Sequence, residues 1–385
     1  MINLAVPNLT GNEKKYLDEC IDTTFVSSVG RFVTKLEELC CEKTGAKYSV
    51  ATSCGTTGLQ LALLAVGVKK DELVLIPSLT FIATANAVKH CGADPWCIDI
   101  NKESWTISPR ALNEELKTKT KIIDGKVIHI ESGKRVAAIM PVYTLGTPAD
   151  MDEINNIADK YNLPVIADAA AAIGAKYKKR DIGDIATLTV FSFNGNKTIT
   201  CGGGGMVVGN NKELIEKIRH LSTTARVSKQ YDHDMVGFNY RMTNVQAAIG
   251  CAQIERLDDF IMKKHEIRNF YNNHFKDIED IKLFPYPEYA DSACWFSGVV
   301  LENANSKIIN EICDELLEEG IEARSFWKPI HLQKPYLEVK KSCMINTEYI
   351  WDKIITLPCS TNITDKELEE VYNKFMLLYK KKLKK

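Results

Sequence analysis

The sequence lacks an excess of charge of either sign. Its 385 residues include 49 lysines and arginines against 50 aspartates and glutamates. Proteins that hold nucleic acid by its phosphates usually concentrate basic residues on one face. No basic stripe with interleaved aromatic residues is present, and the one strong charge run, residues 380–385, is typical of a solvated chain end. We therefore expect no nucleic acid among the partners.

Patterns typical of metal sites, disulfide frameworks and membrane spans are also missing. The seven histidines are scattered without ligand spacing, and no two of the twelve cysteines form a C-x-x-C pair. No apolar run approaches the length that crosses a bilayer, and the first residues do not resemble a secretion signal. We therefore expect no metal, no membrane, and free thiols in the cytoplasm.

Two common fingerprints of nucleotide binding are absent as well. The chain contains neither the P-loop pattern nor a G-x-G-x-x-G turn between a strand and a helix. These absences argue against a plain nucleotide-binding α/β protein, which would depend on one of the two.

Short apolar runs that alternate with helical stretches fill the first two-thirds of the chain. Strands are predicted at residues 48–52, 73–77, 96–100, 136–143, 164–167, 188–193 and 206–208. Helices are predicted at 57–66 and 82–90, and a hairpin at 121–135. Continuously apolar strands suit a sheet buried on both faces, and their alternation with helices indicates an α/β fold with a mostly parallel sheet.

The pattern changes near Glu255. The elements expected beyond it are a long charged helix at 255–275, a strand at 296–301, and helices at 306–319 and 365–379. This mixture indicates a smaller α+β unit. We therefore expect a large α/β domain at 1–255 and a small C-terminal α+β domain at 256–385.

The carboxyl ends of the predicted strands carry the residues of chemical interest, and in open α/β sheets such ends meet at one edge. Residues 53–58 follow the first strand and contain only small side chains, including Gly55 and Thr56. At a helix start, such residues expose backbone N–H groups that bind phosphate. The alternative is an ordinary helix cap.

Asp168 follows the strand at 164–167, with only alanines directly after it. A carboxylate at this edge can keep a ring nitrogen protonated by charge pairing, or it can simply cap a turn. Phe81 follows the second strand and could stack on such a ring, or serve as a core phenylalanine.

Lys197 lies in the stretch FSFNGNKTITCGGGG, residues 191–205. Most isolated lysines are surface residues, but glycines let the backbone approach a ligand closely. A lysine held in a closed pocket has a lowered pKa, so it can form a Schiff base and move a proton. Ser192 could add a hydroxyl to a phosphate. A phosphate cradle, an aspartate and a lysine in this order match the needs of pyridoxal phosphate (PLP).

Taken in order, these motifs resemble the DegT/DnrJ/EryC1/StrS family of sugar aminotransferases over nearly the whole chain. They are residues 55–56, 80–87, 146–151, 168–170, 191–197 and 204–206. Three further segments are similar to the nucleotide-4-keto-6-deoxysugar aminotransferases of legionaminic acid and bacillosamine biosynthesis. They are residues 26–30, 132–139 and 193–197.

The resemblance implies a PLP-dependent transferase of fold type I, like aspartate aminotransferase, with a mostly parallel seven-stranded sheet. It implies a homodimer that moves an amino group from glutamate, leaving 2-oxoglutarate, to C4 of a nucleotide-linked 4-keto-6-deoxy sugar. The expected sugar is UDP-4-keto-6-deoxy-N-acetylhexosamine. Alternatives are transfer to C3, a dTDP- or GDP-linked sugar, or a non-catalytic PLP-binding regulator, which the intact Lys197, Asp168 and Ser192 disfavour.

Residue roles also follow from the resemblance. It implies that Lys197 binds the cofactor covalently and shuttles the proton, that Asp168 pairs with the pyridine nitrogen, and that Phe81 stacks on the ring. The residues expected to hold the cofactor phosphate are Gly55, Thr56, Ser192 and, from the partner subunit of a dimer, Asn239. The residues expected at the substrate are Ser27, Arg241 and His331.

Two departures from the family pattern lie beside the expected site. Three residues after the cofactor aspartate the family usually has Gln or Glu, near the 3-hydroxyl of the cofactor, and this chain has Ala171. Residues 143–147, which begin Tyr143-Thr144, replace the more usual run that contains a histidine. We expect these changes to affect which sugar is used and how fast the reaction runs, rather than which cofactor is bound.

Overall fold

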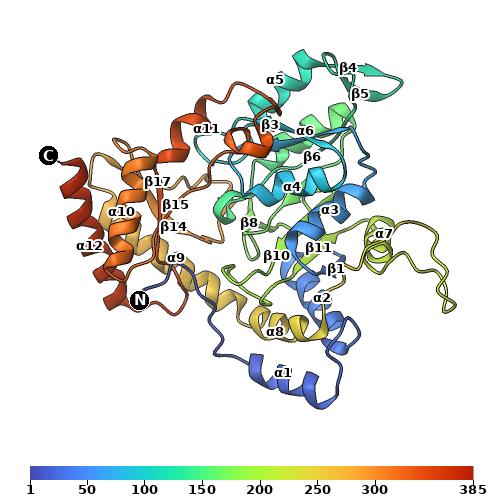
Figure 1. The fold of residues 1–385 in the computed structure, drawn as a ribbon, viewed down its shortest axis with the longest axis horizontal. Coiled ribbons are helices and arrows are strands. Elements are labelled where there is room, and N and C mark those ends of the chain that lie inside the picture. Colours follow the sequence, from blue (N-terminus) through green and yellow to red (C-terminus); the bar gives the residue numbers. More distant parts are fainter. Residues whose placement is uncertain (385) are drawn as a thin grey trace.

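The computed structural model describes residues 1–384 (Figure 1). Its larger part contains two four-stranded sheets with the strand orders β1-β11-β10-β7 and β16-β3-β2-β6. The strands are β1 (Tyr48–Thr52), β2 (Leu73–Pro77), β3 (Asp94–Ile98), β6 (Val136–Ile139), β7 (Ile166–Asp168), β10 (Leu188–Ser192), β11 (Gly205–Gly209) and β16 (Lys340–Lys341). All seven strands predicted within 1–255 are present, although β3 is shifted by two residues and β6 is shorter.

The pairing of these strands is mixed. β7, β10, β2, β3, β6 and β16 pair in parallel, whereas β11 runs antiparallel to both β1 and β10. Two isolated parallel bridges, Ile139 to Val165 and Val142 to Asp168, join the two sheets at the neighbouring edges of β6 and β7. β6 ends before Pro141, which has no N–H for a ladder. Because these strands run in the same direction and the bridges join the two sheets, the carboxyl ends of the parallel strands lie along one common edge.

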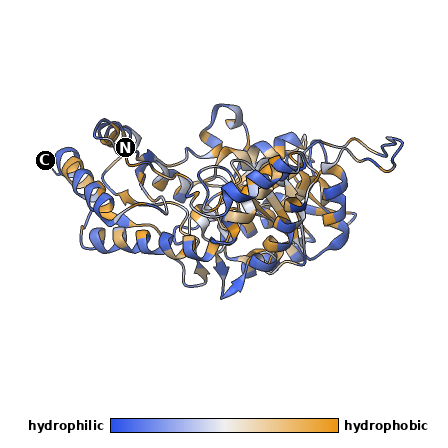
Figure 2. Cartoon of the chain, turned by 90° about the horizontal axis from the view of Figure 1, so that it is seen from below, coloured by the Kyte–Doolittle hydropathy of each residue, from blue (hydrophilic) through white to orange (hydrophobic). Residues whose placement is uncertain are grey.

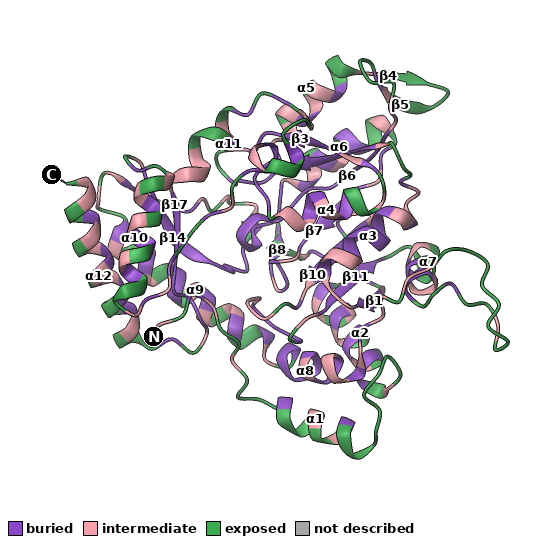
Figure 3. Ribbon diagram, in the orientation of Figure 1, coloured by how far each residue is buried: buried purple, intermediate pink, exposed green. Residues whose placement is uncertain are grey.

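Helices cover both faces of these sheets, as the continuously apolar strands predict. The helices are α1 (Glu13–Asp22), α2 (Arg31–Thr44), α3 (Gly55–Ala65), α4 (Ile82–His90), α5 (Pro109–Lys119), α6 (Met151–Tyr161), α7 (Lys212–Ser222) and α8 (Asn244–Ile254). One core cluster joins strand residues to α2, α5, α6 and α8, and a second joins them to α3, α4 and α7. Buried residues follow the strands and α3 (Figure 3).

The C-terminal part is built around a third sheet with the strand order β12-β14-β17-β15. Its elements are α9 (Leu257–Phe275), β12 (Ile281–Leu283), β14 (Ser297–Leu301), α10 (Ser306–Glu318), β15 (Arg324–Ser325), α11 (Ile345–Ile350), β17 (Ile354–Leu357) and α12 (Asp365–Leu383). Its core cluster unites this sheet with α9, α10 and α12. Hydrophilic residues lie on the outer faces of these helices (Figure 2).

Three segments cross the expected boundary at 255/256. Ile2 bridges to Ile321 beside the third sheet, and β16 pairs with β3 of the large part. β13 (Ala290–Asp291) pairs with β8 (Lys176–Tyr177), which also pairs with β9 (Arg180–Asp181). We propose that 1–255 and 256–385 are the two domains, with these segments exchanged between them.

The hairpin predicted at 121–135 is confirmed as β4 (Thr120–Ile123) and β5 (Lys126–His129), which pair antiparallel. Both turn residues, Asp124 and Gly125, have positive φ, as a two-residue hairpin turn requires. A second projection, the segment between α7 and α8, reaches away from the body (Figure 1).

Residues 1–384 contain no helix that is long and apolar enough to cross a membrane. Within the same residues, no group of three or more histidine, cysteine or acidic side chains has a geometry that could hold a metal ion. The twelve cysteines are present as free thiols.

Candidate active site

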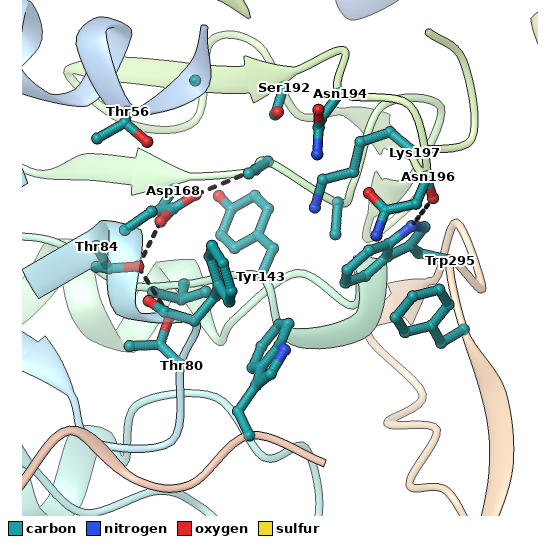
Figure 4. A pocket seen from close by; sticks show the side chains of 18 of the residues that line it. Thr56, Thr80, Thr84, Tyr143, Asp168, Ser192, Asn194, Asn196, Lys197 and Trp295 are labelled. Atoms are coloured by element: carbon teal, nitrogen blue, oxygen red, sulfur yellow. Dashed lines mark hydrogen bonds between the residues drawn. The ribbon is translucent and has the colours of Figure 1, made fainter. Parts of the chain in front are cut away.

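A cavity of about 360 Å³ opens at the carboxyl edge of the sheets. The larger part contributes the start of α3, the ends of β7 and β10, and the loops after β2 and β6. The C-terminal part closes the cavity with residues 295–296 and 324–327. Figure 4 shows Asp168 and Lys197 on opposite sides of this space, with Thr56 and Ser192 along one border.

The start of α3 forms one wall. The helix begins at Gly55, two residues before the predicted start, because the Cys54 thiol accepts a hydrogen bond from the Thr57 amide and caps it. A Cβ at Gly55 would come within 2.9 Å of the Cβ of Ser192, so only glycine fits beside this serine. The N–H groups of Gly55 and Thr56, in this first turn, have no partner within the helix. Together with the Ser192 hydroxyl they make an anion cradle.

Asp168 ends β7 and is buried. One carboxylate oxygen accepts a hydrogen bond from the Thr84 hydroxyl at 2.7 Å, and the other accepts one from the Ala170 amide at 3.2 Å. Burial raises the pKa of Asp168, while these two donors and the charge of Lys197 oppose that rise. The carboxylate is thus held in one orientation, and a cationic ligand group would stabilise its charged form.

Lys197 extends into the cavity from the loop after β10. Its Nζ lies 3.6 Å from the centroid of the Trp295 ring, and the indole N–H donates to the Asn196 carbonyl at 2.6 Å. Burial lowers the pKa of Lys197 to about 8, against the opposing charge of Asp168. About a tenth of this amine is therefore neutral, and nucleophilic, at pH 7.

The main chain of Trp295 is held by a second lysine, Lys264, which the sequence did not single out. The buried Lys264 of α9 donates from Nζ to the carbonyls of Trp295 at 2.9 Å and Cys359 at 2.6 Å. No spacing in the sequence connects these residues with Lys197, because they come from the other part of the chain.

Aromatic side chains line the remaining border of the cavity. Phe81 is 54% exposed and faces Trp327, with ring centroids 6.0 Å apart, and Trp327 stacks on Phe326 at 4.5 Å. A large exposed phenylalanine that lines a cavity differs from the core residue that was the alternative, and such a ring suits contact with a flat ligand.

The structure brings six of the predicted residues to this cavity and leaves four outside it. Those that line it are Gly55, Thr56, Phe81, Asp168, Ser192 and Lys197. Arg241 pairs instead with Glu37 and donates to the Ala51 carbonyl at 3.2 Å. The ring nitrogens of His331 are engaged by the Ser78 hydroxyl at 2.6 Å and by Glu348 at 3.1 Å.

The other two predicted residues are on the surface. Ser27 is exposed, and its carbonyl accepts from the Asn244 amide at 2.6 Å. Asn239 is also exposed, at the base of the projecting segment, where it bridges to Thr223. Neither lines the cavity of its own chain.

The residues present fit PLP in chemistry. An anion cradle suits its phosphate, a buried carboxylate suits its pyridine nitrogen, and a lysine of lowered pKa suits its aldehyde. These features, at the carboxyl edge of a mixed α/β sheet, define a PLP-dependent enzyme of fold type I. The model of the DegT/DnrJ/EryC1/StrS aminotransferase family matches residues 7–376, and the chain belongs to this family of PLP-dependent sugar aminotransferases.

Individual relatives agree with this membership. The chain is 36% identical over 363 residues to the GDP-perosamine synthase of Escherichia coli O157:H7, and the aligned region covers 94% of each protein. It is 32% identical to the UDP-4-amino-4,6-dideoxy-N-acetyl-beta-L-altrosamine transaminase of Campylobacter jejuni, over 96% of each. The fold matches that of Spr1654 from Streptococcus pneumoniae in its PLP form, with a TM-score of 0.89, 22% identity and 99% of each chain covered.

Proposed function

We propose that this chain moves an amino group from glutamate to C4 of a nucleotide-linked 4-keto-6-deoxy sugar. The strongest support is that Lys197, Asp168 and Ser192 line one cavity at the start of α3. Two relatives are named for a GDP-linked and a UDP-linked sugar. A UDP-linked 4-keto-6-deoxy-N-acetylhexosamine is our first candidate substrate. A GDP-linked sugar is the second, because the relative named for a GDP-linked sugar also aligns with nearly the whole chain.

In this proposal the chain binds and orients PLP and the substrates, and it moves a proton in each half-reaction. PLP, when bound, supplies an electron sink next to the reacting carbon. The α3 N–H groups at Gly55 and Thr56, with the Ser192 hydroxyl, hold its phosphate, and Asp168 keeps its pyridine nitrogen protonated. The Lys197 amine takes the proton from Cα of glutamate and, in the second half-reaction, gives one to C4 of the sugar. A positioned group of this kind contributes about 10²–10⁴-fold.

We also propose that the enzyme is a homodimer in which Asn239 reaches the cofactor phosphate of the partner. Asn239 is exposed at the base of the projecting segment between α7 and α8. This segment carries large exposed apolar side chains, including Val236, which is 86% exposed. A second copy would cover them. Ser27, Arg241 and His331 remain proposed substrate contacts, and Arg241 would have to leave Glu37 to bind a nucleotide phosphate.

The cytoplasm is our proposed location for this enzyme. Its twelve cysteines are free thiols, and eight of them are buried. Such thiols persist in a reducing compartment.

A visible absorption spectrum tests the proposed function. We expect the purified protein with PLP to show a band that depends on Lys197, that bleaches with glutamate, and that returns with the UDP-linked keto sugar or its GDP-linked counterpart. The Lys197→Ala variant is the control and should show no such band and no turnover. Near-normal turnover in that variant would end the assignment. Bleaching without return would keep the aminotransferase and reject both sugars.

A further inference from the structure

The Tyr143 hydroxyl is a buried donor without a partner among residues 1–384. Tyr143 follows β6, is 1% exposed and lines the cavity, and its hydroxyl makes no hydrogen bond to any described residue. Its main chain is fixed, since the Tyr143 amide donates to the Asp168 carbonyl at 2.9 Å. Because a buried hydroxyl without a partner costs free energy, a group that completes it is expected in the cavity.

Residues 1–384 offer the Tyr143 hydroxyl no hydrogen-bond partner. The residues after Asp168 on the neighbouring strand end are alanines, and Ala171 presents only a methyl group to the same cavity. Burial raises the pKa of Tyr143, so the phenol stays protonated at neutral pH and acts as a donor. Its partner is therefore an acceptor that enters the cavity with a ligand.

The chemistry of PLP identifies that acceptor. A line from the pyridine nitrogen to the aldehyde carbon divides the ring into two edges, one with the phosphate arm and the other with the ring hydroxyl. In Figure 4, Thr56 and Ser192 lie on one side of the space between Asp168 and Lys197, and the Tyr143 ring enters from the other side. Tyr143 is thus opposite the anion cradle.

We propose that the Tyr143 phenol donates a hydrogen bond to the oxygen of the PLP ring hydroxyl. Ala171, which lines the same cavity, has no side-chain donor for this oxygen. The inference rests on the roles proposed above for Asp168 and Lys197, which set the direction of the ring. The hydrogen bond holds the cofactor and stabilises negative charge on that oxygen. It thereby lowers the pH at which the nitrogen linked to Lys197 releases its proton.

Binding measurements on two variants and two ligands test this contact. Tyr143→Phe removes only the hydroxyl. Tyr379→Phe is the matched control, because the Tyr379 hydroxyl is equally buried and unpartnered but lies on α12, outside the cavity. We expect Tyr143→Phe to raise the Kd for PLP about 3–10-fold, the range of one hydrogen bond, and Tyr379→Phe to leave it unchanged.

The second ligand is an analogue of PLP without the ring hydroxyl. If Tyr143 donates to that oxygen, the wild-type protein and Tyr143→Phe should bind the analogue equally. If Tyr143 had a purely structural role, its replacement would weaken the binding of PLP and of the analogue alike, and that result would overturn the inference. A Tyr143→Phe/Ala171→Gln variant, which returns a donor to the cavity, should recover part of the lost affinity for PLP.

The visible spectrum gives a readout that needs no turnover. We expect the pH midpoint of the cofactor band to rise by about 0.5–1 unit in Tyr143→Phe, which corresponds to the same 3–10-fold change, and to stay constant in Tyr379→Phe. An unchanged midpoint together with unchanged PLP binding would refute the role of Tyr143 and leave the proposed function standing. A wild-type protein without a band that depends on Lys197 would instead refute the proposed function.

Discussion

At the residue scale, the Lys197 amine makes a prediction about pH. Only its neutral form attacks the PLP aldehyde, and burial lowers the pKa of this amine to about 8. The neutral fraction, and with it the rate of cofactor uptake by the apoenzyme, should rise about tenfold per pH unit below pH 8 and level off above it. Stopped-flow absorbance measures this rate. N-acetyl-lysine amide is the control, whose rate should keep rising toward pH 10. A protein profile that does the same would contradict the lowered pKa.

The sequence predicted the site residues that follow strands of the large part. Asp168 ends one apolar strand and Lys197 lies in the loop after another, and the parallel edge brings them to one cavity without further information. Trp295 and Lys264 could not be found in this way, because their positions depend on how the two parts pack. Tyr143 was visible only as a departure from the family pattern, and its missing hydrogen-bond partner is a property of the folded chain.

At the scale of an element, α9 carries a buried lysine whose replacement should be costly. Lys264→Met leaves the carbonyls of Trp295 and Cys359 unsatisfied, so we expect the free energy of unfolding to fall by about 1–3 kcal/mol. Lys263→Met, on the same helix, removes only the partly exposed ion pair with Glu266 and should cost less than about 1 kcal/mol. Urea denaturation of both variants measures the difference, and equal values would show that Lys264 does not act as a structural donor.

Element boundaries were predictable where local chemistry sets them. The capping box of Thr364 and Glu367 starts α12 at the predicted Asp365, and the positive φ values of Asp124 and Gly125 close the predicted hairpin. β16 was not predictable, because it consists of two lysines, Lys340 and Lys341, that become a strand only by pairing with β3. A thiol cap such as Cys54 is equally hard to foresee, since the usual capping residues are Ser, Thr, Asp and Asn.

At the scale of the whole molecule, the order of elements predicted an α/β part followed by an α+β part. It could not predict that residues near Ile2 would join the second core or that β16 would join the first sheet, because such exchanges are set by long-range packing. The same limit applies to Asn239. In one chain it lies outside the cavity, and its proposed role requires a second copy.

Mixed dimers test that role directly. If Asn239 serves the partner's site, a dimer of one Lys197→Ala and one Asn239→Ala subunit has one site with both residues intact. Mixing equal amounts of the two variants under exchange conditions should then restore roughly a quarter of wild-type activity, since half of the dimers are mixed and each has one intact site of two.

If Asn239 instead acted in its own chain, every site of the mixed dimer would lack one of the two residues, and mixing would restore nothing. Each variant alone provides the baseline. The wild-type protein mixed with Lys197→Ala is the control for damage by the variant subunit, because the activity per wild-type chain should not change if that subunit leaves its partner's site intact. Recovery in the first mixture, with light scattering showing dimers throughout, would place Asn239 across the subunit interface. The projecting segment would then be the part of each chain that completes the active site of the other.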